Sequence, residues 1–314
     1  MRKNFTYKSS DGKTRIHGMV WIPDHTKRSE IRGIVQIVHG IVEFIGRYDR
    51  FARFLNDQGY LVIGNDHLGH GASVCTDEDH GFFAEPDGNA CLIGDIRKLH
   101  RHTREKFPGV PYFILGHSMG SFLTRQYITR FGNELTGAIL LGTGYQSMAA
   151  VKTGEELCRR IAAVKGWRYR STVLFDIALG SNNRRIKNPR TSYDWLSHDE
   201  AVVDAFAAHP WNTFHFTVNG YYNLFRSIEA ASRPANIQMI PFDLPIFMVS
   251  GDEDPVGDYG KGVRKVYDQY LKNGITNVSM KLYPGLRHEV LNEVGHDTVD
   301  QDLLRWLEDH LEDL

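Results

Sequence analysis

The chain has 314 residues, enough for one large α/β domain with an insertion or for two small domains. Its 41% hydrophobic and 24% charged residues are ordinary for a soluble globular protein. With 37 Lys+Arg against 38 Asp+Glu, the net charge of -1 provides no global field that would attract nucleic acid or an anionic membrane.

The three cysteines are an odd number without a C-x-x-C pair, which is typical of reduced thiols in a cytosolic protein. The first residues lack the apolar core of a signal peptide, and no window approaches the roughly 18 consecutive apolar residues of a membrane span. We therefore expect a cytoplasmic protein. Nothing in the sequence indicates an oligomeric state.

The chain begins with strand patterns. Residues 5–23 predict a β-hairpin, and the nearly continuous β-branched run 33–38 predicts a strand buried on both faces of a parallel sheet. That strand runs into His39, Gly40 and Ile41. We expect His39 to pack this loop, and the N–H of Ile41 to contribute to an oxyanion hole.

A helix is predicted over residues 47–58 and a buried strand over 60–65. They lead into residues 66–73, a turn rich in histidine and glycine, with His80 nearby. The spacing of these histidines matches no familiar zinc site, so we expect no metal here. The turn is better explained as part of the mouth of an active site.

A predicted helix over 89–106 leads into the stretch on which the functional hypothesis depends. An apolar strand ends at Gly116, and helical spacing begins soon after it. Ser118 lies in the break, between Gly116 and Gly120, in the G-x-S-x-G pattern of a nucleophile elbow. The same pattern also occurs as a plain glycine-rich turn. The strand before it and the helix after it favour the catalytic interpretation.

Such an elbow predicts the chemistry of its serine. The Oγ of Ser118 would stand beside the first turn of a helix, whose unpaired N–H groups favour negative charge. The N–H of Met119 would point to the same place, as an oxyanion donor beside that of Ile41.

One further strand pattern, at 137–141, completes an alternation that predicts a parallel, doubly wound sheet. The alternation then stops, and residues 145–243 predict a helical cap over the elbow. Nine of residues 193–225 are aromatic, which suggests an apolar substrate pocket. The stretch 158–190 carries nine Lys/Arg against one acid. A solvated face explains it, and the alternative is a transient contact with a membrane or micelle surface.

After the cap, the chain supplies an acid and then a histidine. In an α/β-hydrolase the order is Ser, acid, His, each at the carboxyl end of a strand. Asp254 follows the strand pattern at 244–249, and His288 follows that at 278–283. Asp252 is the alternative acid because it lies nearer the strand.

Several motifs, in order, resemble the monoacylglycerol lipase and lysophospholipase branch of the α/β-hydrolase family. They are His39-Gly40-Ile41-Val42-Glu43-Phe44 with Arg47-Tyr48, Asp66-His67-Leu68-Gly69-His70-Gly71-Ala72-Ser73, Gly116-His117-Ser118-Met119-Gly120-Ser121, Gly251-Asp252-Glu253-Asp254 and Arg287-His288-Glu289. The resemblance implies an α/β-hydrolase fold: a mostly parallel eight-stranded sheet flanked by helices, with a core of 1–144 and 244–314 and an inserted helical cap at 145–243.

The resemblance also implies a triad of Ser118, Asp254 and His288, with Ile41 and Met119 as oxyanion donors. It favours Asp254 over Asp252, since the family's acid stands three residues after the glycine. The family usually has Glu-His where this chain has Glu-Phe, at 43–44.

We therefore expect a serine hydrolase that cleaves an apolar acyl ester, a monoacylglycerol or lysophospholipid, through an acyl-enzyme on Ser118. No metal or organic cofactor is required. One alternative is other chemistry on the same core: a small-ester esterase, a thioesterase, an aminopeptidase or an acyltransferase. A second is a non-catalytic ligand-binding protein. The basic stretch counts against a peptidase, and the complete triad counts against a binding protein.

Overall fold

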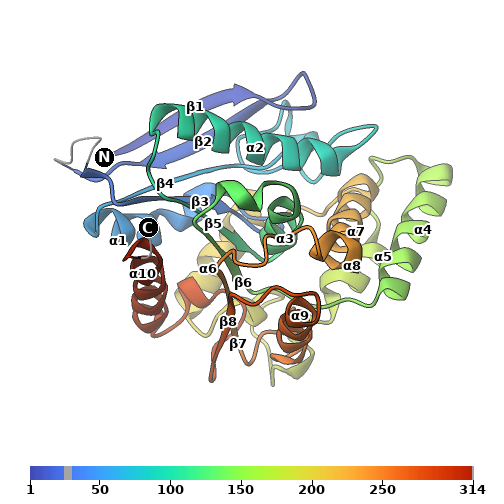
Figure 1. The fold of residues 1–314 in the computed structure, drawn as a ribbon. Coiled ribbons are helices and arrows are strands. Elements are labelled where there is room, and N and C mark those ends of the chain that lie inside the picture. Colours follow the sequence, from blue (N-terminus) through green and yellow to red (C-terminus); the bar gives the residue numbers. More distant parts are fainter. Residues whose placement is uncertain (25–29, 313–314) are drawn as a thin grey trace.

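Eight strands form one sheet in the computed structural model of the chain, which describes residues 1–24 and 30–312 (Figure 1). Their order across the sheet is β1-β2-β4-β3-β5-β6-β7-β8. The strands are β1 (Arg2–Lys8), β2 (Arg15–Trp21), β3 (Gly33–Val38), β4 (Tyr60–Asn65), β5 (Tyr112–His117), β6 (Gly137–Leu141), β7 (Ile246–Gly251) and β8 (Val278–Tyr283). The expected eight-stranded, mostly parallel sheet is confirmed.

The pairing changes direction at one edge of the sheet. β1 pairs with β2, and β2 with β4, in antiparallel register. From β4 onward, across β3, β5, β6, β7 and β8, every neighbouring pair is parallel. Every residue of β3, β4, β5, β6 and β7 is buried. Burial on both faces explains why these strands are continuous apolar runs in the sequence.

Helices cover both faces of the sheet. Successive side chains of a strand point to opposite faces, so in β6 Ile139 packs in one hydrophobic cluster and Leu140 in another. The cluster of Ile139 contains side chains of α1 (Asp49–Asp57) and α10 (His296–Glu312). The cluster of Leu140 contains side chains of α2 (Gly88–Lys106), α3 (Met119–Phe131) and α9 (Lys261–Lys272).

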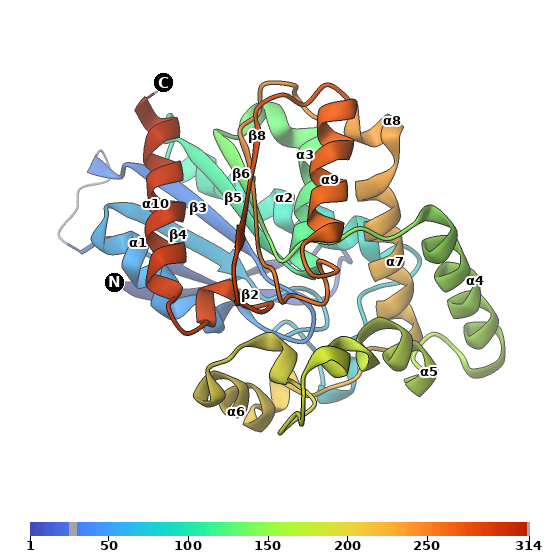
Figure 2. The same ribbon diagram turned by 90° about the horizontal axis from the view of Figure 1, so that it is seen from below.

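The segment between β6 and β7, called the insertion below, is helical. Figure 2 shows α4 running alongside α7 on one side of the sheet, with α6 apart from both. Its elements are α4 (Met148–Lys165), α5 (Thr172–Phe175), η5 (Asp176–Gly180), η6 (Asn182–Arg185), η7 (Asp194–Leu196), α6 (Glu200–Ala208), η8 (Pro210–Asn212), α7 (Val218–Ser232) and α8 (Pro234–Ile237). Within the described ranges, no helix is both long and apolar enough to cross a bilayer.

The three longer helices of the insertion begin at side chains that cap them. The side chain of Ser147 accepts the N–H of Ala150 at 3.2 Å before α4, and that of Thr217 accepts the N–H of Gly220 at 3.2 Å before α7. Asp199 does the same before α6. Such caps satisfy N–H groups that have no partner inside the helix, so the local sequence sets where these helices begin.

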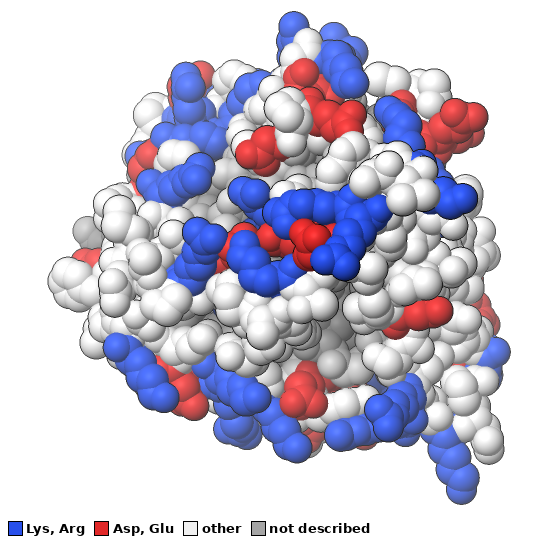
Figure 3. Space-filling view, turned by 90° about the vertical axis from the view of Figure 1, so that its right-hand side faces the viewer, with Lys and Arg blue, Asp and Glu red and all other residues white. Residues whose placement is uncertain are grey.

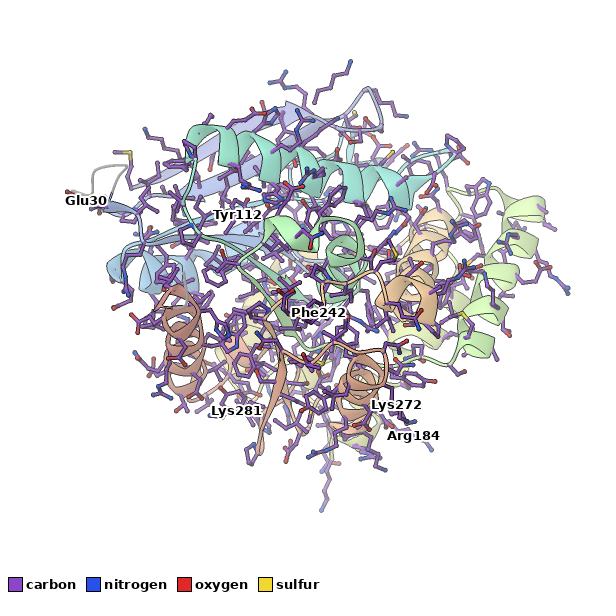
Figure 4. The ribbon with its side chains drawn as sticks, in the orientation of Figure 1. Glu30, Tyr112, Arg184, Phe242, Lys272 and Lys281 are labelled. Atoms are coloured by element: carbon purple, nitrogen blue, oxygen red, sulfur yellow. The ribbon has the colours of Figure 1, made fainter. Side chains whose placement is uncertain are left out.

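Tyr112 and Gln36 form a polar pair inside the core. Tyr112, labelled in Figure 4, lies between the sheet and α2, and its ring centroid is 4.3 Å from that of His100. Its hydroxyl donates to Oε1 of Gln36 on the neighbouring strand at 2.6 Å. A buried hydroxyl and a buried amide thus satisfy each other.

Candidate active site

Ser118 lies in the sharp turn between β5 and α3. Its φ is +53°, in the left-handed region that residues with a side chain rarely adopt. A Cβ on Gly116 would lie 2.4 Å from the carbonyl oxygen of Gly120, and a Cβ on Gly120 would lie 1.9 Å from that of Val38. The packing of β5, α3 and β3 therefore requires both glycines of the motif, and the turn holds Ser118 at the amino-terminal end of α3.

The acid and the base of the predicted triad are in contact. Oδ1 of Asp254, after β7, is 2.9 Å from Nδ1 of His288, after β8, and both side chains are buried. Asp254 also accepts from Ser250 Oγ at 2.9 Å and from the N–H of Val256 at 2.8 Å. Burial alone would raise the pKa of Asp254, but the charge of His288 and these hydrogen bonds lower it, so the carboxylate stays ionised.

The alternative acid, Asp252, is placed elsewhere. Its side chain is exposed and accepts the N–H of Gly285 at 2.7 Å. The structure thus brings Asp254, and not Asp252, to His288.

The second ring nitrogen of His288, Nε2, is buried and has no hydrogen-bond partner in the described part of the chain. The ring is held between Trp195 and His117, at centroid distances of 5.0 and 4.8 Å. His288 lines a small cavity together with Ser118. A fixed imidazole with an unoccupied nitrogen can serve as the base that a serine hydroxyl needs.

Two backbone N–H groups are available beside the serine. Met119 is the first residue of α3, so its N–H has no acceptor within the helix. Ile41 lies in the loop after β3, and its N–H donates to no other described residue. Both residues line a second, larger cavity that Ser118 also lines. This arrangement suits an oxyanion hole.

Buried histidines support the loop that carries Ile41. Nε2 of His39 accepts the N–H of His67 at 3.0 Å, and Nε2 of His70 accepts the N–H of Val42 at 3.3 Å. Burial lowers the pKa of His67 to about 4 and that of His70 to about 3, so both rings are neutral at pH 7. The histidines of the glycine-rich turn therefore hold the backbone of the loop.

A buried charged network, absent from the sequence analysis, joins the loops of the site. Glu43 accepts hydrogen bonds from the N–H of Gly40 and from the N–H at Nδ1 of His117, the latter at 2.9 Å. Arg47 donates to Glu43 at 3.0 Å and forms two hydrogen bonds of 2.7 Å with Glu289. Glu43 lies in the loop that carries Ile41, His117 precedes Ser118, and Glu289 follows His288. The spacing of Glu43 and Arg47 could have indicated an ion pair, but no local pattern pairs Arg47 with Glu289.

Two cavities meet at Ser118. Ile41, Ser118 and Leu179 line both. The larger has a volume of about 400 Å³ and an apolar lining supplied mainly by the insertion, which includes Val151, Gly154, Leu157, Ala178, Leu224, Phe225 and Ile228. The smaller has a volume of about 50 Å³, and its lining includes Glu43, His117, Asn212 and His288 among aromatic and aliphatic side chains. The site therefore offers a larger and a smaller compartment on either side of one serine.

The aromatic residues of the insertion lie mainly around the smaller cavity, where they form an apolar wall beside Ser118. Tyr193, Trp195, Phe206 and Phe214 line that cavity, and of the aromatic residues within 193–225 only Phe225 lines the larger one. The wall of the larger cavity comes mainly from aliphatic side chains of α4, η5 and α7, with Phe122 of α3. Their positions depend on how these elements pack, which a count of aromatic residues does not detect.

Comparison with known proteins identifies the family of the chain. The family model of the serine aminopeptidase family S33 matches residues 29–295. The chain belongs to this family.

This S33 family member is 29% identical over 303 residues to a monoacylglycerol lipase of Mycolicibacterium smegmatis. The aligned region covers 96% of this chain and 95% of that protein. It is 33% identical over 286 residues to a monoglyceride lipase homolog of monkeypox virus, at 88% of both chains. Among solved structures it is similar to a thermostable carboxyl esterase from Bacillus coagulans in complex with glycerol, with a TM-score of 0.91, 28% identity and 99% of both chains covered.

The expected family is confirmed. The chain is an α/β-hydrolase of the monoacylglycerol lipase-like group within S33, and its activity is the hydrolysis of carboxylic esters. A serine acyl-enzyme is the norm of this family.

Proposed function

We propose that the chain hydrolyses monoacylglycerols through an acyl-enzyme on Ser118. Nε2 of His288 takes the proton of Ser118 Oγ as the serine attacks the ester carbonyl, and Asp254 stabilises the resulting imidazolium. The N–H groups of Ile41 and Met119 bind the oxyanion. His288 then protonates the leaving alcohol and activates the water that releases the fatty acid. The contact between Asp254 and His288, beside a cavity shared with Ser118, carries this proposal.

The two cavities support an orientation for the substrate. A leaving oxygen must come within reach of the histidine that protonates it. His288 lines the smaller cavity and is not among the residues that line the larger one. The alcohol therefore occupies the smaller cavity, and the acyl chain occupies the larger one.

The size of the smaller cavity favours a small alcohol. Its volume is about 50 Å³, and by the same measure one water molecule needs about 10–15 Å³. A group of a few non-hydrogen atoms matches this space. Glycerol fits that description better than the phosphorylated head group of a lysophospholipid does.

We propose that residues 145–243 act as a cap that also touches the lipid surface. The side chains of Val164, Val173 and Ile177 are 79%, 55% and 55% exposed on α4, α5 and η5. Exposed basic side chains accompany them, among them Lys165 and Arg184, the latter at the lower right of Figure 4. Apolar side chains beside basic ones suit transient contact with an interface.

The charges on the face formed by α4 and α7 neutralise one another, so this face is not the proposed lipid-contacting surface. Figure 3 shows basic side chains around acidic ones in the middle of this face. Lys152 pairs with Glu155 at 3.1 Å and also with Glu229, and Arg160 pairs with Glu156 at 2.8 Å.

Sedimentation with phosphatidylcholine vesicles tests the proposed lipid contact. We expect Val173→Asp to lower the fraction of protein that sediments with the vesicles. An unchanged fraction argues against the contact.

Release of fatty acid from 1-oleoylglycerol tests the catalytic proposal. We expect Ser118→Ala to lose at least about 10³-fold in kcat while its circular dichroism is unchanged, because the nucleophile is gone and the fold is not. His288→Gln loses a similar factor, whereas the matched variant His296→Gln, on the surface of α10, stays active. A fully active Ser118→Ala enzyme refutes the proposal. Wild-type activity confined to acetate esters indicates a small-ester esterase instead.

A further inference from the structure

The smaller cavity contains a polar side chain that catalysis does not use. Asn212 ends η8 in the insertion, is 2% exposed and lines the cavity together with Ser118 and His288. Its Oδ1 is buried and has no hydrogen-bond partner in the described part of the structure. Buried amides are almost always paired, so an unpaired one in the wall of a substrate cavity points to a group that the substrate supplies.

The segment that carries Asn212 is firmly attached to the core. The ring of Phe44 lies 4.7 Å from that of His209 and 5.2 Å from that of Trp211. Nδ1 of His209 also accepts the N–H of Trp211 at 3.1 Å. Phe44 is the residue at which this chain departs from the Glu-His pattern of its family. Here the departure gives η8 an aromatic support, which fixes the position of the neighbouring Asn212.

The other buried polar atoms of this cavity complement the amide. Burial alone would lower the pKa of His117, but the charge and hydrogen bond of Glu43 raise it. Nε2 of His117 is buried and unpaired within the described residues, and His117 lines the same cavity. The lining of the cavity thus includes an imidazole and, at Asn212, an amide, each with an unpaired polar atom.

We propose that Asn212 determines the specificity for the alcohol: it forms a hydrogen bond with a free hydroxyl of the leaving group, so the site selects monoesters of small polyols over esters of simple alcohols. This inference rests on the proposed function. A hydroxyl can donate to Oδ1 of Asn212, whereas an alkyl group leaves the amide buried and unpaired. Sites built to pair a substrate hydroxyl discriminate strongly against analogues that lack it.

Two esters of one acid test the proposal. 1-Decanoylglycerol and propyl decanoate have the same acyl chain and the same three alcohol carbons, and only the first carries free hydroxyls. We expect Asn212→Leu to lower kcat/KM for the glycerol ester about tenfold and to leave that for the propyl ester unchanged or raised. The preference for the glycerol ester then collapses. Because the substitution removes an unpaired polar atom, the melting temperature is unchanged or higher.

Asn182→Leu is the matched control. Asn182 is also a buried asparagine of the insertion with an unpaired amide atom, but it lines neither cavity. It should leave the ratio of the two kcat/KM values at the wild-type level. Asn212→Ala serves in the same assay if the leucine variant does not fold.

The outcomes separate the two proposals. A variant that loses activity equally on both esters, or keeps the wild-type ratio, overturns the assignment of Asn212 while wild-type cleavage of the glycerol ester still supports the proposed function. A wild-type enzyme that cleaves neither ester overturns the proposed function, and the assignment of Asn212 with it.

Discussion

Arg47 and Glu289 form a bidentate ion pair, with both N–O distances at 2.7 Å, although the two residues are 242 positions apart in the sequence. Glu289 directly follows the histidine of the site. Arg47 also binds Glu43, which accepts the N–H of Gly40 in the loop that carries Ile41. One guanidinium thus joins the segment that carries the proposed base, His288, to the segment that carries the proposed oxyanion donor, Ile41.

Removal of this guanidinium should destabilise the fold. Arg47→Met leaves the carboxylates of Glu43 and Glu289 buried without their partner. Loss of one partner from a buried ion pair costs about 3–5 kcal/mol in the free energy of unfolding. Urea unfolding followed by circular dichroism measures this loss. The control Arg53→Met removes an exposed ion pair with Asp49 and should leave the unfolding midpoint unchanged; equal midpoints for both variants contradict the prediction.

The two candidate acids should separate in activity. Asp254→Asn removes the charge that holds His288 and favours the wrong tautomer, so we expect kcat to fall by about 10³- to 10⁴-fold. Asp252→Asn removes a bond to the N–H of Gly285 and should keep most of the activity. Initial rates on one p-nitrophenyl ester compare the variants. A larger loss for Asp252→Asn would assign the catalytic acid to that residue.

The sequence allows prediction of the sheet, the elbow and the order of the site residues because each has a local cause. Strands β3 to β7 are continuous apolar runs, and Gly116 and Gly120 mark a turn that only glycine fits. The pairing of Arg47 with Glu289 and the position of Asn212 have no local signal, since tertiary packing creates both. The aliphatic wall of the larger cavity has no local signal for the same reason: it forms only when α4, η5 and α7 come together.

Acid should destabilise the protein before its carboxylates titrate. Burial lowers the pKa of His67 to about 4 and that of His70 to about 3, against about 6.5 in the unfolded chain. The unfolded state therefore binds more protons below pH 6.5, and stability falls as the pH drops from there toward the folded pKa values. For each of these two histidines, the free energy of unfolding falls by about 2 kcal/mol between pH 6.5 and pH 5. His117, whose pKa is raised, acts in the opposite direction.

Urea unfolding at pH 7.5, 6.0 and 5.0 measures this dependence. We expect His70→Gln to flatten it, because glutamine can still accept the N–H of Val42 and does not become charged. A wild-type free energy of unfolding that is constant across this range contradicts the assignment of neutral buried histidines.

The length of the acyl chain should depend on α4. Leu157 is half-buried and lines the larger cavity, so Leu157→Trp fills part of it. We expect kcat/KM for a palmitate ester to fall at least about tenfold relative to a butyrate ester, because the long chain then meets a steric barrier. The control Val164→Trp places the same ring on the exposed end of that helix. Equal effects on the two esters would show that the acyl chain lies elsewhere.

Most of the wall of the larger cavity is supplied by helices outside the sheet, and this has an evolutionary consequence. The triad candidates and oxyanion donors are held by the ends of strands, where the glycines of the elbow leave almost no freedom for substitution. Most of the wall of the cavity belongs to α4, η5 and α7, outside that framework, although Ile41, Ser118 and Met119 also line it. Mutations can therefore diversify the acyl preference of a lineage one residue at a time while purifying selection preserves its chemistry.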